Sequence, residues 1–421
     1  MDILLQKFFE KERWEKAIDT GVGKHIDKGE LRKLTCPDTR VRLYKAIVTD
    51  NYAISPPHVA LIPKDTPGEF REVMICENID RIVLSIINNL FFEMFPEFIH
   101  NSCKSYRSGI GCGKVVKEAS AECVKVKGNI VGKKYDLKKY FDRVKLKYID
   151  ALFDRMEQKY GKSKIIDIVR EFYHCNILFD ADGNLVEEYK SIKQGTATSS
   201  FLADALLYHI DEELSKLNEI KYWRYSDDIL ILGENYKVAD TILKKRLAEM
   251  ELQVNEKKEE ILDKDHYFKF LGFSICGDKI TLSKGRVKDF QKEIQSRTVN
   301  QRKITPTKAI NSVNNYLYKG DGQFSWATSV LPIINVQHDI DEMNEFVLDC
   351  IRGVMTGKGK TGGLGYVNDK PEGVIVRGIG KNVSANRVKT PKEIEGFLSI
   401  RCMQNALLTN REVYNTLVRS M

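Results

Sequence analysis

The chain has 421 residues, with 67 Lys and Arg against 59 Asp and Glu and a net charge of +8, so it is long enough for two or three lobes around a large core. Its nine cysteines form no CxxC pair and no Cys/His cluster, which argues against a disulfide framework and against a zinc site. Residues 1–5 lack the basic start of a signal peptide, and no apolar run approaches the length of a membrane span, so we expect a cytoplasmic protein.

The first predicted element is a basic hairpin. Residues 62–71 form two apolar-flanked stretches around a turn at Pro67-Gly68, and Pro-Gly pairs mark turns. We expect Lys64 and Arg71 to face each other across this hairpin. Residues 78–95 then carry apolar side chains at helical spacing, which predicts a helix. A short loop with Tyr106 and Arg107 follows at residues 105–109. Taken alone, both basic segments are ordinary solvated turns.

A strand is predicted where Asn129-Ile130-Val131 begins, and it would carry Asp136 at its end. Phe141 lies five residues further on, where core packing is the ordinary role of such a ring. Residues 145–190 can hold a segment inserted between this strand and the elements that follow it. The pair Gln194-Gly195 comes next, and the apolar spacing after it predicts a helix over residues 201–210.

The most informative segment is Tyr225-Ser226-Asp227-Asp228, between two short β-branched and aromatic runs at residues 220–224 and 229–232. This pattern predicts a hairpin whose turn, Ser226 to Asp228, holds two neighbouring carboxylates. Two like charges so close are costly unless a cation neutralises them, and a hard divalent cation such as Mg²⁺ prefers oxygen ligands. Most Asp-Asp turns are merely solvated, so this interpretation depends on the surrounding residues.

Further segments follow the hairpin in order, with Asn255 and Lys258 first and Leu271-Gly272 after them. Five segments in this order resemble the five motifs of the reverse transcriptase palm. They are, in order, Asp136 with Phe141, Gln194-Gly195, Tyr225 to Asp228, Asn255 with Lys258, and Leu271-Gly272. The resemblance covers residues from about 60 to 275. One match would carry little weight, whereas five in order make a specific signal.

The resemblance implies an α+β right-hand polymerase fold. Fingers would occupy residues 1–130, and a palm with an antiparallel sheet and helices on one face would occupy 131–280. Residues 281–421 would form a mainly helical, basic thumb or RNA-binding region.

The resemblance also implies RNA-templated DNA synthesis by a two-metal nucleotidyl transfer. Asp136, Asp227 and Asp228 would hold two Mg²⁺ ions, with Mn²⁺ as a substitute. The residues expected at the nucleotide are Lys64, Arg71, Phe141, Gln194, Gly195 and Lys258. Among them, Lys64 and Arg71 would hold the triphosphate, and Phe141 would be the steric gate that selects deoxynucleotides. Arg107 and Tyr225 are expected to contact nucleic acid.

The charge is unevenly distributed along the chain. Residues 281–421 hold 21 Lys and Arg against 13 Asp and Glu, so they account for the whole net charge of +8. Such a concentration is typical of a surface that binds a phosphate backbone, although a solvated helix face is the ordinary alternative. The candidates are Lys284, Arg286, Lys288, Lys292, Arg302 and Lys303. The Gly-rich segment 353–392 does not match a phosphate-binding loop, and is either an RNA-contacting basic loop or a crossing loop without function.

Within the family, the compact length and intact palm are most similar to bacterial defence-associated enzymes of the unknown-group or abortive-infection type, class 2. This resemblance implies a noncoding RNA as template, a DNA product or primer, deoxynucleotides as substrates and a role against phage. Alternatives are a retron or group II intron-like enzyme, template-independent or protein-primed DNA synthesis, and an inactive polymerase-fold RNA-binding protein. The sequence leaves open the template, the primer and the oligomeric state.

Overall fold

The computed structural model describes residues 2–19, 21–64, 68–107, 109–320, 325–357, 363–366, 374–377 and 394–420. Most of the predicted basic loop 353–392 lies outside the described residues. The chain divides into two compact units. The N-terminal unit comprises residues 1–108, 133–231 and 235–260, and the C-terminal unit comprises 109–132, 232–234 and 261–421. The fold is mixed α+β, as expected, whereas the fingers, palm and thumb boundaries stay predictions.

The N-terminal unit begins with helices. They are α1 Ile3–Phe8, α2 Lys11–Asp19, the 3₁₀ segment η1 Gly21–His25, α3 Lys28–Thr35, α4 Pro37–Val48 and α5 Asn78–Met94, followed by η2 Pro96–Phe98. The helix predicted over residues 78–95 is confirmed as α5, which is the centre of this unit's core because its apolar side chains recur on more than one face. Its fully buried members include Ile82, Val83, Ile87, Leu90 and Phe91.

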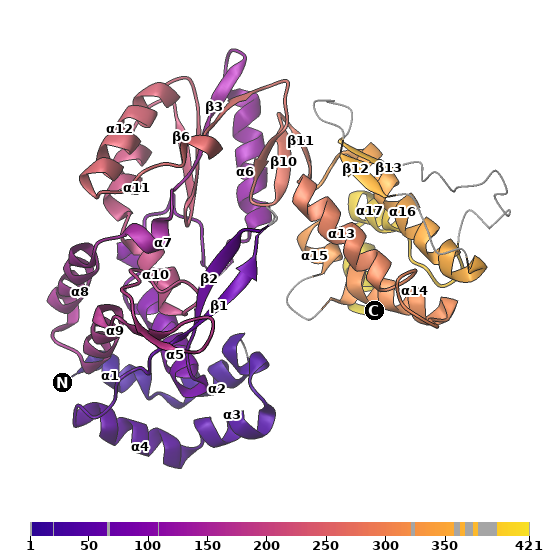
Figure 1. The fold of residues 1–421 in the computed structure, drawn as a ribbon. Helices are drawn as coiled ribbons and strands as arrows, with labels where there is room; N and C mark the ends of the chain where they lie inside the picture. Colours follow the sequence, from indigo (N-terminus) through magenta and orange to yellow (C-terminus); the bar gives the residue numbers. More distant parts are fainter. Residues whose placement is uncertain are drawn as a thin grey trace. The chain divides into compact units, whose positions relative to one another are not determined.

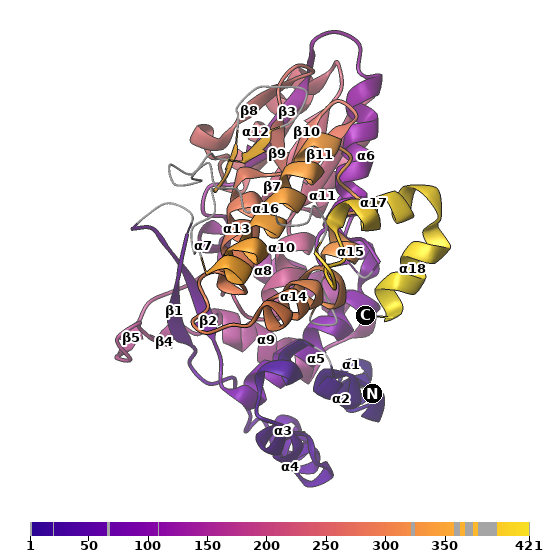
Figure 2. The ribbon, with the colours of Figure 1, turned by 90° about the vertical axis from the view of Figure 1, so that its right-hand side faces the viewer.

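The predicted basic hairpin is confirmed as β1 His58–Pro63 and β2 Phe70–Ile75, which pair antiparallel. The sheet order is β2-β1-β4-β5. The two short strands β4 Ile177–Phe179 and β5 Leu185–Glu187 lie beside the hairpin (Figure 2). Helices α8 Leu146–Tyr160 and α9 Lys164–His174 precede them. The segment 145–190 therefore contributes strands to the hairpin's sheet.

A second sheet has the order β6-β7-β3-β8. Its strands are β3 Ile130–Asp136, β6 Lys221–Tyr225, β7 Asp228–Leu232 and β8 Glu260–Asp263. Helices α11 Tyr208–Ser215 and α12 Tyr236–Glu249 lie beside β6 (Figure 1). Shorter elements complete this region, namely α7 Tyr140–Arg143, α10 Thr198–Ala205 and η3 Glu256–Lys258. The single helix expected over 201–210 is wrong in one respect, because a turn at residues 206–207 separates α10 from α11.

The described part of the C-terminal unit is mainly helical after residue 283, as expected. Helix α6 Cys112–Lys125 packs on a three-stranded sheet of order β11-β10-β9. The strands are β9 Phe268–Phe270, β10 Phe273–Cys276 and β11 Lys279–Leu282. The remaining elements are α13 Lys284–Ser296, α14 Pro306–Asn314, η4 Asn315–Lys319, α15 Trp326–Ser329, α16 Gln337–Thr356, β12 Leu364–Tyr366, β13 Ile375–Arg377, α17 Ile400–Thr409 and α18 Arg411–Ser420.

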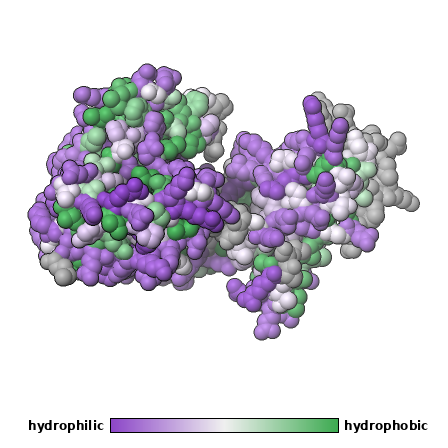
Figure 3. All heavy atoms as spheres, turned by 90° about the horizontal axis from the view of Figure 1, so that it is seen from below, coloured by the Kyte–Doolittle hydropathy of each residue, from purple (hydrophilic) through white to green (hydrophobic). Residues whose placement is uncertain are grey.

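Hydrophilic side chains predominate on the face seen in Figure 3, where hydrophobic residues form separate patches. Among the helices that the structure describes, none combines the length and the apolar character needed to cross a bilayer.

Candidate active site

The turn between β6 and β7 brings the aspartates together. Ser226 adopts a positive φ of 56°, a conformation that costs energy for a residue with a side chain and that a tight turn can require. The turn is shorter than expected, because Asp228 already belongs to β7. The carbonyl oxygen of Asp227 accepts a hydrogen bond of 3.1 Å from the backbone N–H of Leu137. Asp136, the last residue of β3, therefore lies beside the turn that carries Asp227 and Asp228.

The carboxylates of this cluster repel one another. Burial raises the pKa of Asp228 to about 6, and the charges of Asp227 and Asp136 add to that shift. Burial and the charge of Asp136 also raise the pKa of Asp227, against the opposing charges of Lys258 and Arg71. The shifts show that negative charge here is only partly compensated by the protein.

Asp136 has the most polar contacts of the three. Lys258 Nζ lies 2.9 Å from its Oδ2, and Asn255 Nδ2 lies 3.5 Å from its Oδ1. The backbone N–H of Asn255 also donates to the carbonyl oxygen of Asp136 at 2.7 Å. The fourth predicted segment therefore lies directly against the first. Asn255 is a site residue that the sequence analysis placed in a motif without giving it a role.

The donor chemistry of the three aspartates fits a divalent cation, because carboxylate oxygens are hard ligands and their mutual repulsion would be relieved by a bound positive charge. Their arrangement is not a closed metal centre. In the described ranges, no three or more Asp, Glu, His or Cys side chains are grouped as metal ligands would be, and Lys258 is paired with one oxygen of Asp136.

Gly195 is required by close packing. Its φ is +101°, and a Cβ atom there would lie 2.9 Å from the carbonyl oxygen of Met74 and 3.0 Å from its nitrogen. The backbone N–H of Met74 donates to the carbonyl oxygen of Gln194 at 2.6 Å. The resemblance implies that this glycine borders the nucleotide, whereas its contacts with Met74 in strand β2 are already a sufficient reason for a glycine here.

The ring of Phe141 is half-buried on α7 and packs against the core. It meets the ring of Tyr140 edge-on, with 5.6 Å between their centroids. Core packing is therefore real for Phe141, and its partial exposure leaves a further role available.

Lys64 and Arg71 of the β1–β2 hairpin lie in different surroundings. Arg71 is opposite Ile62 in the register, and the backbone N–H of Lys64 bonds to Glu69 at 2.9 Å. The expectation that Lys64 directly faces Arg71 is wrong, because the register is shifted by two residues. Lys64 pairs loosely with the Glu69 side chain at 3.7 Å. The charge of Arg71, in contrast, opposes the rise in the pKa of Asp227, so Arg71 acts on the aspartate cluster.

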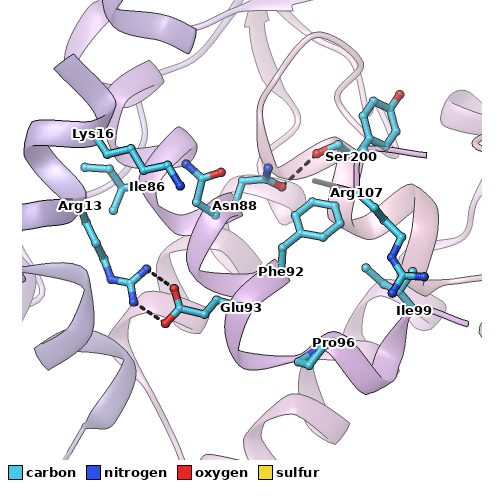
Figure 4. Close-up of a pocket in the computed structure, with 12 residues that line it drawn as sticks. Arg13, Lys16, Ile86, Asn88, Phe92, Glu93, Pro96, Ile99, Arg107 and Ser200 are labelled. Carbon is cyan, nitrogen blue, oxygen red and sulfur yellow. Dashed lines mark hydrogen bonds and ion pairs between the residues drawn. The ribbon is translucent and has the colours of Figure 1, made fainter. Parts of the chain in front are cut away.

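The loop with Tyr106 and Arg107 borders a cavity of about 530 Å³ (Figure 4). Its wall combines apolar, amide and basic side chains, namely Arg13, Lys16, Ile86, Asn88, Asn89, Phe92, Glu93, Pro96, Ile99, Tyr106, Arg107 and Ser200. Two hydrogen bonds of 2.9 and 2.7 Å join Arg13 to Glu93, whereas Arg107 makes long contacts of 3.5 Å with Asn101 and with the Cys103 carbonyl. Tyr225 lies at the end of β6 and is half-buried.

The basic candidates of the C-terminal unit separate into two kinds. Lys284, Lys288 and Lys292 are exposed at four-residue spacing on α13, which places them on one helix face; we call them the α13 stripe. Arg302 and Lys303 are exposed beyond the helix. Arg286 differs, because its guanidinium lies 4.8 Å from the centre of the Phe273 ring. It also fills the space where a side chain on Gly272 would lie, with Nε 2.7 Å from a Cβ there.

One group of residues escaped the sequence analysis. Arg224, Asp204 and Asp211 are each fully buried next to the turn, and burial raises the pKa of Asp204 to about 6 against the opposing effect of Arg224. A signal existed in the sequence, since Asp204 and Asp211 interrupt an apolar helical pattern where a charge needs a buried partner.

Comparison with known proteins agrees with this geometry. The family model described as reverse transcriptase (RNA-dependent DNA polymerase) matches residues 62–275. A comparison with curated proteins found no significant match.

Solved structures similar to this chain include telomerases. An apo telomerase from Candida tropicalis truncated from the C-terminal domain is 14% identical, with a TM-score of 0.40 and coverage of 57% of this chain and 59% of that one. A telomerase from Candida albicans in complex with a TWJ fragment of telomeric RNA is 14% identical, with a TM-score of 0.40 and coverage of 75% and 63%. Apo telomerase from C. tropicalis is 12% identical, with a TM-score of 0.44 and coverage of 72% and 59%. The chain thus spans 59% to 63% of these telomerase chains.

Proposed function

This chain belongs to the reverse transcriptase (RNA-dependent DNA polymerase) family, whose model matches just over half of it, and we propose that it copies RNA into DNA by nucleotidyl transfer at Asp136, Asp227 and Asp228. The observation that carries the proposal is the β6–β7 turn, which holds two carboxylates of raised pKa beside the end of β3. A pure RNA-binding protein gains nothing from clustered negative charge near a polyanion.

The three aspartates would hold two Mg²⁺ ions, or Mn²⁺ in their place. Such ions supply Lewis acidity at the attacking and leaving oxygens of a phosphoryl transfer. The protein's part is to keep the carboxylates aligned. Lys258 pairs with Asp136 at 2.9 Å, and its side chain, 60% exposed, is free to turn toward an incoming triphosphate. Arg71 offers that triphosphate a planar fork.

Further roles follow the same proposal. Lys64 would add a point charge near the triphosphate, and Gln194-Gly195 would border the nucleotide. Phe141 would select deoxynucleotides by excluding a 2′-hydroxyl. The cavity beside Arg107 would accept unpaired template, because aromatic, amide and guanidinium groups suit single-stranded RNA.

The α13 stripe, with Arg302 and Lys303, would bind the phosphates of the template–product duplex. Tyr225 would contact nucleic acid as well. We also propose that the template is a noncoding RNA, that the protein acts in the bacterial cytoplasm, and that its DNA synthesis serves defence against phage. These statements rest on the resemblance to defence-associated members of the family.

The test replaces both turn aspartates by alanine. The variant Asp227→Ala/Asp228→Ala should lose incorporation of deoxynucleotides on a primed RNA template by about a thousandfold or more, since several kcal/mol of transition-state stabilisation disappear. Its melting temperature should stay the same or rise, because the substitutions remove carboxylates that repel each other. The matched control Asp19→Ala/Asp182→Ala removes two exposed carboxylates of the same unit and should leave incorporation unchanged.

Incorporation by the turn variant at the wild-type rate would refute the proposed mechanism. RNA binding without incorporation by the wild-type protein, over a series of primers and with both Mg²⁺ and Mn²⁺, would favour an inactive polymerase-fold RNA-binding protein.

A further inference from the structure

The two peptide groups that flank Ser226 in the β6–β7 turn are each held by a buried side chain. The backbone N–H of Ser226 donates to Ser105 Oγ at 2.9 Å. The carbonyl oxygen of the same residue accepts from Arg224 Nη1 at 3.2 Å. Ser105, Arg224 and Ser226 are at most 5% exposed. The positive φ of Ser226 is therefore stabilised by two hydrogen bonds that water does not replace.

Arg224 uses every donor that a guanidinium has. Nε and Nη2 donate to the two oxygens of Asp211 at 2.7 and 2.6 Å. Nη1 donates to the Ala203 carbonyl at 3.1 Å as well as to Ser226, and Nη2 donates to the Asp204 carbonyl at 2.7 Å. The five N–H groups thus have five acceptors. Because Ala203 and Asp204 belong to α10, this one side chain joins the turn to the helix that follows Gln194-Gly195.

Ser105 completes the connection from the other side. Its hydroxyl donates to Asp204 Oδ1 at 2.5 Å, which leaves its oxygen available to accept from Ser226. The chain before it pairs with β6, since Arg224 N–H donates to the Ser102 carbonyl at 2.9 Å and Lys104 N–H to the Arg224 carbonyl at 2.8 Å. Among the residues that the structure describes, the second carboxylate oxygen of Asp204 has no hydrogen-bond partner.

Stability alone does not account for this network. Taking an arginine and two aspartates out of water carries a desolvation penalty, and apolar residues of similar volume often stabilise a core equally well or better. Apolar residues cannot, however, hold a carbonyl and an N–H of a turn in fixed positions. The contacts that an apolar replacement would lose are those to Ser226, one residue before Asp227.

We propose that Ser105, Asp204, Asp211 and Arg224 are positioning residues that hold Asp227 and Asp228 in register with Asp136. The inference rests on the proposed function of the aspartates and adds the parts that fix their geometry. A carboxylate displaced by a fraction of an ångström would still attract a cation but would align it poorly with the substrate.

Two variants test the inference, and neither leaves Arg224 or Asp211 buried without the other. Ser105→Ala removes one hydroxyl, and the pair Arg224→Met/Asp211→Leu replaces the ion pair with apolar side chains of similar size. Each should lower kcat about 10- to 100-fold with little change in the KM for deoxynucleotide, as is typical for loss of groups that orient metal ligands. Ser105→Thr, which keeps the hydroxyl, should recover part of the loss.

The matched control is Ser163→Ala. Ser163 is also a buried serine of the N-terminal unit, and its hydroxyl accepts from the N–H of Ile165 at the start of α9. Its loss should lower the melting temperature at least as much as Ser105→Ala while leaving kcat unchanged.

Two readouts do not depend on activity. Backbone hydrogen exchange of a peptide spanning residues 222–230 should be faster in Ser105→Ala than in the control, and calorimetric titration with Mn²⁺ alone should show weaker binding. Wild-type kcat, exchange and Mn²⁺ affinity in folded variants would overturn the inference. If Asp227→Ala/Asp228→Ala abolishes synthesis while these variants behave like Ser163→Ala, the inference alone fails and the proposed function stands.

Discussion

The β6–β7 turn and the α13 stripe both depend on charged residues, and they hold them in opposite ways. Around the turn, Arg224, Asp204 and Asp211 are fully buried, and each has at least one polar contact within 2.7 Å. On α13, Lys284, Lys288 and Lys292 are exposed, opposite the buried side chains of Val287, Phe290 and Ile294. Buried, bonded charge fixes geometry and is insensitive to salt, whereas exposed charge supplies affinity that salt screens. Four predictions test this contrast, from the largest expected effect to the smallest.

The first compares the cost of losing one charge in each region. Asp211→Ala leaves Arg224 buried without its carboxylate and should lower the free energy of unfolding by about 3–5 kcal/mol. Lys288→Ala should change it by less than about 0.5 kcal/mol. Urea denaturation of both variants gives the comparison. If both variants lost the same small amount of unfolding free energy, the ion pair of Arg224 and Asp211 would not contribute to stability.

The second prediction concerns the choice between deoxynucleotides and ribonucleotides, which we assign to Phe141 rather than to the exposed α13 stripe. Phe141→Ala should raise the ratio of ribonucleotide to deoxynucleotide incorporation by about tenfold, because a methyl group leaves room for a 2′-hydroxyl. Single-nucleotide incorporation on one primed template measures the ratio. Phe9→Ala is the control, since Phe9 is another half-buried ring packed against the same core. An unchanged ratio would assign Phe141 to packing alone.

The third tests the exposed region. The triple variant Lys284→Gln/Lys288→Gln/Lys292→Gln should weaken RNA binding and reduce the slope of log affinity against log salt by about 2, at roughly 0.7–0.9 per lost phosphate contact. Arg286 is left intact because it packs on Phe273. The control Lys216→Gln/Lys237→Gln/Lys245→Gln removes the same charge from α12 and the end of α11. If both triple variants give the same slope, only net charge matters and the stripe is a solvated face.

The fourth concerns pH. The carboxyl of Asp204 has a pKa of about 6 in the folded protein, above the ordinary value near 4, so the folded state binds this proton more tightly than the unfolded state. Its stabilising contribution is complete below about pH 4 and is lost as the pH rises through 6. Asp204→Asn should reduce the fall in melting temperature between pH 4.5 and 7.5. Identical profiles would show that Asp204 titrates normally.

Local patterns in the sequence predicted the parts of the site that are built locally. The β6–β7 hairpin, the strand ending at Asp136 and helix α5 all follow from the periodicity and turn chemistry of contiguous residues. The register of the basic hairpin did not follow, because a shift of two residues preserves which side chains share a face.

The buried network was not predicted for a different reason. The contacts of Asp204 with Ser105 and with Arg224 join residues that are 99 and 20 positions apart in the sequence. Charged side chains are also expected at the surface unless a specific partner is known. Only the tertiary fold shows that α10, the loop at residue 105 and β6 meet at one turn.

The close packing of Gly195 bears on which residues indicate whether a similar chain is active. Any side chain at this position would collide with the main chain of Met74 and would also need a φ near +101°. A copy that had lost its chemistry would therefore still need glycine at position 195 in order to fold. The opposite holds for Asp227 and Asp228. An inactive copy would become more stable if these two carboxylates were replaced, because they repel each other. The two turn carboxylates, rather than the glycine, are the positions at which loss of activity would first become visible.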